Sequence, residues 1–234
     1  MKTIILPRRE TLAAAARSIA VLLDEKPQAV LAVSSGDDCL ELYDVLASLC
    51  AEGQLDLSQA RLFALTEFEG LSADDARSCR ARLQNRLVGP CAVPASQVRF
   101  LSENDLERYD DEIAAAGGLD LAIVGIGLNG RFGFNEPATP YDSLTHRQKL
   151  THKSRLELAR LFGGEEQVPA FGLTAGVKTV VEAKKILVLA LGGDRADAVY
   201  KMLYARTDSF VPAAFLQLPL QVDVYLDKSA AEKL

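Results

Sequence analysis

Three segments of the chain place polar or glycine residues directly after an apolar run, and these residues could do chemistry. The segments are Ser34-Ser35-Gly36-Asp37-Asp38, Thr66-Glu67-Phe68-Glu69-Gly70 and Gly125-Ile126-Gly127-Leu128-Asn129-Gly130-Arg131. In an open parallel sheet, ligands bind beyond the carboxyl ends of the strands. If the apolar runs are parallel strands, the three segments meet at one edge of the sheet and form one site.

The glycine segment satisfies G-x-G-x-x-G, a pattern found in dinucleotide-binding turns. That fingerprint also requires a helix to start in the turn and an acidic residue about 20 positions further on. Here Gly133 and Pro137 follow closely and oppose a helix. We therefore expect no nucleotide cofactor; the plain alternative for the glycine string is a tight turn that brings the backbone close to another segment, and Gly127 is a candidate substrate contact.

Ser35 and Gly36 lie between an apolar run and a helical pattern, which suggests two interpretations. The free N–H groups of a helix start can cradle an anion such as phosphate. Asp37 and Asp38 would repel that anion, whereas Asp is a favourable residue at a helix cap or in the first turn. The residue types favour capping over an anion cradle.

Several carboxylates are candidates for a general base. Glu67 and Glu69 follow an apolar run, and Glu136 lies in Asn135-Glu136-Pro137. A carboxylate in a cleft can move protons, while the alternative is a solvated loop charge or the partner of a nearby arginine. Both interpretations stay open for all three glutamates.

The two histidines and two of the arginines lie on or beside predicted helices. His146 and His152 are expected at the surface or in the core rather than in catalysis, and Arg160 and Arg195 are expected in surface ion pairs. Thr151 is the expected N-cap of the helix that follows, with Ser154 as the other candidate.

Composition limits the classes of protein that the chain can belong to. Its 234 residues are 49% apolar and 25% charged, enough for one domain, 1–234, with a full core. The net charge of −6 and the absence of a basic run exclude a nucleic-acid footprint. Two histidines and cysteines without C-x-x-C spacing predict no metal site, and the four thiols indicate a reduced, cytoplasmic protein. No apolar stretch is long enough to predict a membrane span.

Short apolar runs alternate with helical patterns along the chain, as in βαβ units. Strands are expected at 3–6, 29–33, 62–65, 119–125, 186–191 and 222–226. Helices are expected at 9–25, 38–52, 74–88, 105–116, 153–162, 174–183 and 194–205. Runs without polar alternation predict central strands covered on both faces, and therefore a sheet between two layers of helices. The stretch 132–150 has little periodicity and is expected to be a functional loop.

Together these segments resemble a known family. Gly125 to Pro137 is similar to the G-x-G-x-D-G-H-x-A-F-N-E-P signature of glucosamine-6-phosphate deaminases and galactosamine-6-phosphate isomerases. Leu65 to Leu71 resembles their M-D-E-Y-x-G-L segment, and Phe171 to Gly176 their A-L-T-x-G helix start. The order holds from Ala29 to Leu226. The resemblance implies a Rossmann-like three-layer α/β/α sandwich with a mostly parallel sheet and a phosphorylated amino-sugar as ligand. The sister 6-phosphogluconolactonases share the glycine turn.

The resemblance also implies a reaction, in which a proton moves between C2 and C1 of the opened sugar before ammonia leaves. Position by position, the C2 base of the family falls on Thr66, the Asp of its D-G-H triplet on Asn129, and its ring-opening His on Arg131. Only Glu136 keeps its type. Thr, Asn and Arg have no usable basic form near neutral pH, so the family reaction is expected to be weak.

The phosphate contacts implied by the resemblance are mixed. Arg160 falls on a phosphate-binding Arg of the family and Arg195 on a Lys, so both positive charges persist. Arginine gives planar, bidentate recognition of phosphate.

In the loop that would meet the phosphate, Ser35 and Gly36 match the Thr-Gly of the family, but Asp37 and Asp38 replace uncharged residues. The two aspartates are expected to hold an amine, a sugar hydroxyl or one of the arginines.

Three functions follow as hypotheses. The first is a divergent member of this family that acts on or binds a phosphorylated amino-sugar, with a homo-oligomer possible. The second is a catalytically silent module that binds a sugar derivative. The third is another reaction in the same cleft, such as lactone hydrolysis, with Glu67, Glu136, Asp37 or Asp38 as acid/base; it would be supported if Asp37 or Asp38 faced Arg131.

Overall fold

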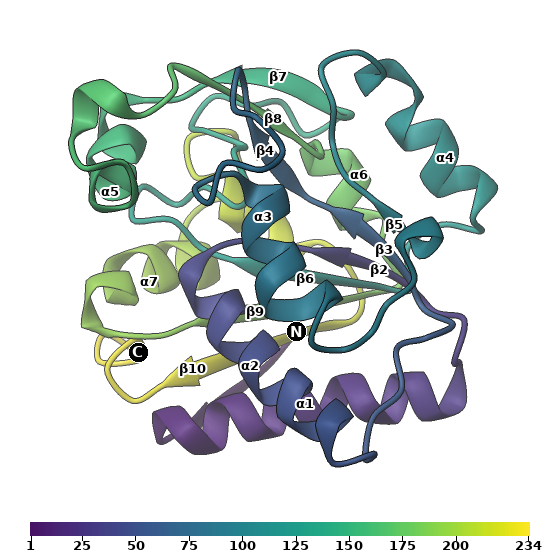
Figure 1. The fold of residues 1–234 in the computed structure, drawn as a ribbon. Helices are drawn as coiled ribbons and strands as arrows, with labels where there is room; N and C mark the ends of the chain where they lie inside the picture. The colour runs from purple at the N-terminus through teal and green to yellow at the C-terminus, as the bar shows by residue number, and fades with distance from the viewer.

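A seven-stranded sheet, parallel throughout, runs through the middle of the structure, a computed structural model that describes residues 1–234 (Figure 1). The strand order is β1-β10-β9-β6-β2-β3-β5. The strands are β1 (Lys2–Leu6), β2 (Val30–Val33), β3 (Arg61–Ala64), β5 (Val98–Arg99), β6 (Leu121–Gly125), β9 (Lys185–Ala190) and β10 (Val222–Asp227). The six strands expected from the apolar runs are confirmed to within two residues at each end. Strand β5 is too short to leave an apolar pattern and was not expected.

Helices cover both faces of this sheet (Figure 1). On one side lie α1 (Arg8–Glu25), α2 (Asp37–Ala51) and α3 (Cys79–Leu83), which continues as a π-helical turn, Gln84–Val88. On the other lie α4 (Tyr109–Ala115), α6 (Val177–Val181) and α7 (Ala196–Tyr204). Short 3-10 turns occur at Ala95–Gln97, Leu106–Arg108, Glu165–Gln167, Gly193–Arg195 and Pro212–Gln217. The expected three-layer α/β/α architecture is confirmed.

The central strands carry apolar residues on both faces because each face packs against helices. In β2, Leu31 and Val33 belong to the core under α1 and α2, whereas Val30 and Ala32 belong to the core under α6 and α7. All four side chains are buried. This is the arrangement that an apolar run without alternation predicts.

A second, antiparallel sheet of three strands was not expected. It consists of β4 (Thr66–Phe68), β8 (Phe171–Thr174) and β7 (His146–Lys149), in that order, and α5 (His152–Phe162) follows β7. Two expectations are therefore wrong: the stretch 132–150 contains a strand, and Thr174 ends a strand, so that helix α6 begins only at Val177. The polar sequence of β7 gives no apolar alternation, and pairing with β4 and β7 decides the conformation at Thr174.

The expected helix 74–88 is also wrong at its start. The helix begins at Cys79, after Ser78, whose hydroxyl accepts a hydrogen bond from the N–H of Ala81. This cap ends the preceding turn and fixes where the helix leaves the small sheet.

Gly176 joins the small sheet to α6 and gives a stability prediction. A Cβ at this position would overlap the backbone carbonyls of Ser143 and Leu144, which cannot move as a flexible side chain would. We expect Gly176→Ala to lower the free energy of unfolding by about 3 kcal/mol. The matched control is Gly193→Ala, where a Cβ would meet only the Glu232 carboxylate, at 3.6 Å. Urea unfolding should show the control within about 1 kcal/mol of the parent protein; equal stabilities for both variants would contradict the packing account.

None of the helices combines the length and the apolar character needed to cross a bilayer. All four cysteines are free thiols, and Cys39, Cys79 and Cys91 are buried. No three His, Cys, Asp or Glu side chains are grouped so that they could hold a metal ion.

Candidate functional site

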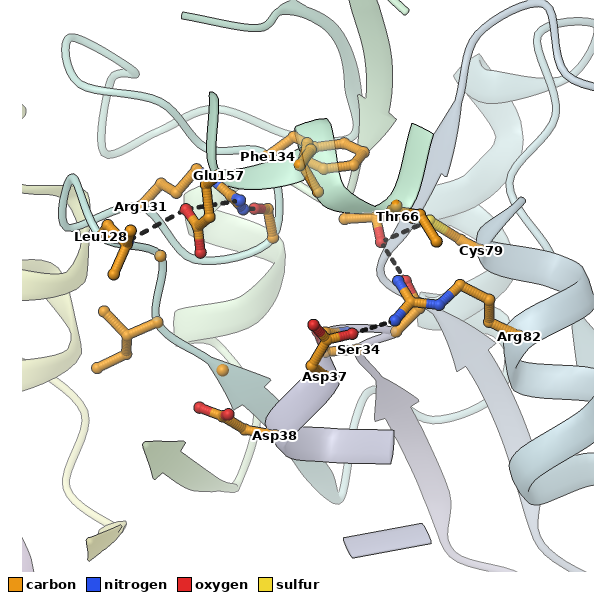
Figure 2. A pocket seen from close by; sticks show the side chains of 18 of the residues that line it. Ser34, Asp37, Asp38, Thr66, Cys79, Arg82, Leu128, Arg131, Phe134 and Glu157 are labelled. Atoms are coloured by element: carbon orange, nitrogen blue, oxygen red, sulfur yellow. Dashed lines mark hydrogen bonds and ion pairs between the residues drawn. The ribbon is translucent and has the colours of Figure 1, made fainter. Parts of the chain in front are cut away.

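A pocket of about 520 Å³ opens beyond the carboxyl ends of β2, β3 and β6. The three segments that the sequence singled out meet there. Nine of the predicted site residues line it: Ser35, Gly36, Asp37, Asp38, Thr66, Gly127, Arg131, Arg160 and Arg195. Figure 2 shows Asp37 and Asp38 at the start of α2, with Thr66 on one wall and Arg131 on the other.

Glu67 does not line the pocket. Its carboxylate accepts hydrogen bonds from the backbone N–H groups of Cys79 and Arg80, both at 2.9 Å, and of Phe68, at 2.7 Å. Burial raises the pKa of Glu67, and these three N–H groups oppose that effect. The side chain holds the N-terminus of α3 in place, so the expectation that it could act as a general base in the cleft has no geometric support.

Glu136 and Asn129 also lie behind the pocket wall. Asn129 Nδ2 donates to Glu136 Oε2 at 2.6 Å and to Ser154 Oγ at 3.1 Å. The Thr151 hydroxyl donates to the same carboxylate at 3.0 Å, and Glu136 is 1% exposed. The Asn129 amide thus supplies a donor to a buried carboxylate. Thr151 is the N-cap of α5, as expected, because its Oγ1 accepts from the Ser154 N–H.

On the wall at Thr66, the Thr66 side chain is hydrogen-bonded to a hydroxyl and a thiol. Thr66 Oγ1 shares a hydrogen bond with Ser35 Oγ at 3.3 Å and donates to Cys79 Sγ at 3.4 Å (Figure 2). Burial raises the pKa of Cys79 to about 12. None of these three groups can accept a proton from carbon near neutral pH.

The opposite wall is a largely buried ion-pair network centred on Glu157. The carboxylate accepts from Leu128 N and from Arg131 Nη2, both at 3.2 Å, and is also hydrogen-bonded to Arg195 Nη1. Burial by itself would raise the pKa of Glu157, but Arg131, Arg195 and the Leu128 N–H hold it below its ordinary value. Glu157 is therefore an ionised carboxylate between two guanidinium groups.

Arg131 is fixed by further contacts. Its Nε donates to Ser154 Oγ at 2.9 Å and its Nη1 to the carbonyl of Gly133 at 2.6 Å, while the guanidinium lies 5.7 Å from the Phe134 ring centre. The absence of a side chain at Gly127 leaves room for Arg131, because a Cβ at position 127 would lie 2.6 Å from Arg131 Cγ. The glycine turn thus accommodates the Arg131 side chain.

The two aspartates at the start of α2 pair with arginines. Asp37 forms ion pairs with Arg82 and, at 2.9 Å, with Arg160. Asp38 Oδ2 lies 3.9 Å from Arg195 Nε and accepts from Leu191 N at 3.1 Å. Neither aspartate forms an ion pair or a hydrogen bond with Arg131, so no contact with Arg131 supports a relocated acid/base pair.

The helix cap is Gly36, and the aspartates occupy the first turn. The arginine contacts expected for the two aspartates are present.

The charges in the pocket balance. The acidic lining residues are Asp37, Asp38, Glu157 and Asp194, and the basic ones are Arg82, Arg131, Arg160 and Arg195. Anion recognition here is therefore in competition with internal carboxylates.

Asp38 should make anion binding depend on pH. Burial raises its pKa to about 6, against the opposing effects of Arg195, the Leu191 N–H and Arg8; Glu41 adds to the rise. Below pH 6 the carboxyl becomes neutral and no longer offsets the charge of Arg195. We expect sulfate, which stays a dianion, to bind about three- to tenfold more tightly at pH 5 than at pH 7 by calorimetry. In Asp38→Asn, the sulfate affinity should differ by less than about twofold between pH 5 and pH 7. An equal pH dependence in both proteins would contradict this assignment.

The remaining candidates lie outside the pocket. His146 contacts the carbonyl of Leu144 and the side chain of Gln148, and His152 pairs with Glu165, so both histidines are engaged in contacts away from the pocket.

Glu69 forms a surface ion pair with Arg147, the solvated alternative that the sequence left open.

Two residues of the site were missed by the sequence reasoning. Glu157 lies three residues before Arg160 on α5 and so shares a helix face with it, a signal that could have placed it at the pocket. Arg82 lies on α3, far along the chain from its partner Asp37, and no local pattern indicates that contact.

Comparison with known proteins supports the resemblance over the whole chain. The model of the family described as glucosamine-6-phosphate isomerases/6-phosphogluconolactonase matches residues 8–224. The chain is 34% identical to a glucosamine-6-phosphate deaminase of Clostridium botulinum strain Hall, with 94% of this chain and 93% of the relative covered. It is 37% identical to a glucosamine-6-phosphate deaminase of Streptomyces avermitilis, with 94% and 87% covered.

Solved structures agree with this assignment. A monomeric glucosamine-6-phosphate deaminase superposes with a TM-score of 0.96 at 32% identity, and each chain is covered completely. The 6-phosphogluconolactonase of Thermotoga maritima superposes with a TM-score of 0.76 at 19% identity over 97% of this chain and 98% of the other, a likeness of fold alone. The protein described here belongs to the family of glucosamine-6-phosphate isomerases and 6-phosphogluconolactonases.

Proposed function

We propose that this protein binds a phosphorylated amino-sugar in the pocket and lacks most of the proton-transfer activity of a deaminase. The substrate class follows from the family and from the deaminases that share about a third of its residues. The loss of proton transfer follows from the side chains that line the pocket.

The observation that carries the proposal is the wall at Thr66. The resemblance puts the base that acts on C2 at this position, and here Thr66 is hydrogen-bonded to Ser35 and Cys79 with no carboxylate among them. The neighbouring Glu67 cannot replace it, because its carboxylate is held by the N-terminus of α3. A general acid/base step contributes about 10²- to 10⁴-fold to a rate, so deaminase turnover should fall by at least that factor.

Retained binding is supported by what remains around the pocket. Ser35 and Gly36 keep the loop at the start of α2, and Arg160 and Arg195 keep two guanidinium groups beside it. Arg160 is largely exposed, with 87% of its side chain accessible, so it can turn from Asp37 toward a ligand at little cost.

The test is to incubate the folded protein with glucosamine-6-phosphate and galactosamine-6-phosphate, to follow ammonia and ketose phosphate, and to record the melting temperature with each sugar. The proposal predicts a rise in melting temperature and product formation close to that of a buffer control. Turnover at the rate of a deaminase assayed in parallel would overturn the catalytic part, and no shift with either sugar would overturn the binding part.

The same samples should be assayed for lactone hydrolysis with 6-phosphogluconolactone. Three of the four pocket carboxylates, on Asp37, Asp38 and Glu157, lie beside arginines, and burial raises the pKa of Asp38 to about 6. Hydrolysis that disappears in Asp38→Asn would replace the binding proposal by this second function.

A further inference from the structure

We propose that Glu157 sets the ligand selectivity of this pocket, because its carboxylate occupies an anion site that the chain builds from Leu128 N, Arg131 and Arg195. The ligand class in this inference rests on the proposed function, whereas the competition between Glu157 and anions does not. The consequence is that the pocket disfavours simple dianions and prefers a phosphate whose charge is partly balanced by an ammonium group on the same molecule.

The geometry of the Glu157 carboxylate is that of a bound anion. Both oxygens are occupied: Oε2 accepts from Leu128 N and Arg131 Nη2, each at 3.2 Å, and Oε1 pairs with Arg195 Nη1. A backbone N–H of a glycine turn with two guanidinium groups is a set of donors that suits an external carboxylate or phosphate equally well. Here the occupant comes from α5 of the same chain, and Figure 2 shows it lying between Leu128 and Arg131 at the pocket wall.

The ion-pair network around Glu157 is partly open to a ligand. Glu157, Arg131 and Arg195 all line the pocket. Arg195 Nε is buried and has no hydrogen-bond acceptor; Asp38 Oδ2 lies 3.9 Å from it, too far for a hydrogen bond. Arg195 therefore retains an unsatisfied donor while its Nη1 is held by Glu157.

The carboxylate charges of the pocket offset its guanidinium charges. With Glu157 ionised, the two guanidinium groups on this wall are offset by Glu157 and Asp38, and on the other side Asp37 offsets Arg82 and Arg160. A dianion that enters must approach these carboxylates, which costs affinity in a site of low dielectric. An ammonium group on the ligand removes part of that cost, because it can be placed near a carboxylate.

The experiment compares Glu157→Gln with the parent protein. Glutamine keeps the volume and an acceptor oxygen but removes the charge. By calorimetry at about pH 7.5, inorganic sulfate should bind at least about tenfold more tightly to E157Q. The matched control is Asp194→Asn, which removes the same charge from a pocket residue that makes no hydrogen bond or ion pair with an arginine. The affinity of this control variant for sulfate should change less than about threefold. Unchanged or weaker sulfate binding in folded E157Q would overturn the inference and make Glu157 a residue that only positions the arginines.

Selectivity is measured in the same way with glucosamine-6-phosphate and glucose-6-phosphate, which differ in the amine. The parent protein should prefer the amino-sugar, and E157Q should lose most of that preference. If neither sugar binds but sulfate binding still rises in E157Q, the proposed function fails and the anion-site inference stands. If both sugars bind equally to the parent protein and to E157Q, the inference about selectivity fails while the proposed function stands.

A second variant keeps the test decisive if E157Q does not fold. Arg131→Met with Glu157→Leu removes the buried pair together and leaves Arg195 without that counter-charge. This double variant should bind sulfate at least as tightly as the parent protein, although it has lost one arginine. Weaker binding would contradict the competition that we propose.

Discussion

Replacing Arg131 by methionine is expected to lower the free energy of unfolding by about 3 kcal/mol, the lower end of the range for removing one partner of a buried ion pair. Arg131 donates to Ser154, to the Gly133 carbonyl and to Glu157, and it is 8% exposed. Its loss leaves Glu157 buried with one guanidinium in place of two. The lower end applies because Arg195 and the Leu128 N–H still hold that carboxylate.

Urea unfolding measures this loss, and the slope with denaturant should stay constant. The control is Arg155→Met on the same helix as Glu157, which breaks a half-exposed pair with Glu165 and should cost under about 1 kcal/mol. Equal losses for the two variants would contradict a buried network at the pocket wall. The double variant R131M/E157L should recover part of the loss, because the Glu157 charge goes together with the Arg131 charge, while Arg195 keeps Asp38, at 3.9 Å, as its counter-charge.

Restoring the residues implied by the family should bring back proton transfer. The variant Thr66→Asp, Asn129→Asp and Arg131→His is expected to raise ammonia release from glucosamine-6-phosphate by at least ~10²-fold over the parent protein. The carboxylate introduced at position 66 would stand at the pocket wall beside Ser35, where none is present now. The carboxylate introduced at position 129 would lie next to Glu136, whose Oε2 is 2.6 Å from Asn129 Nδ2, and the two carboxylates need the imidazole at position 131 as a shared partner.

For this reason the three changes should act together, and single changes should give little. The matched control is Thr66→Asn with Arg131→Asn, which introduces polar side chains without a basic form at two of the three positions. A folded triple variant with no more activity than this control would mean that Asp37 and Asp38 have remodelled the ligand site as well as the acid/base set.

The sequence predicted the fold well because the parallel sheet depends on long apolar runs. Runs such as Leu121–Gly125 and Lys185–Ala190 are buried on both faces and leave no ambiguity about a central strand. The small sheet was missed because β7 is polar and short, so its conformation depends on pairing with β8 rather than on local pattern.

The candidate site was predictable in place but not in contacts. Strand ends and the glycine turn located the pocket, since the carboxyl ends of parallel strands share one edge of a sheet. They could not show that the Glu67 carboxylate would accept a hydrogen bond from the N-terminus of α3, or that Glu157 would bridge Arg131 and Arg195. Those contacts join segments far apart in the chain and depend on tertiary packing.

We expect the pocket to bind a hexosamine phosphate without a base over C2. Proton NMR of glucosamine-6-phosphate in D₂O with the parent protein tests it directly, because exchange of the C2 proton reports the first chemical step without requiring product release. We expect broadened or shifted sugar resonances that show binding, with the C2–H signal lost no faster than in buffer. Protein-dependent loss of the C2–H signal, at a rate comparable to that of a deaminase control, would contradict it.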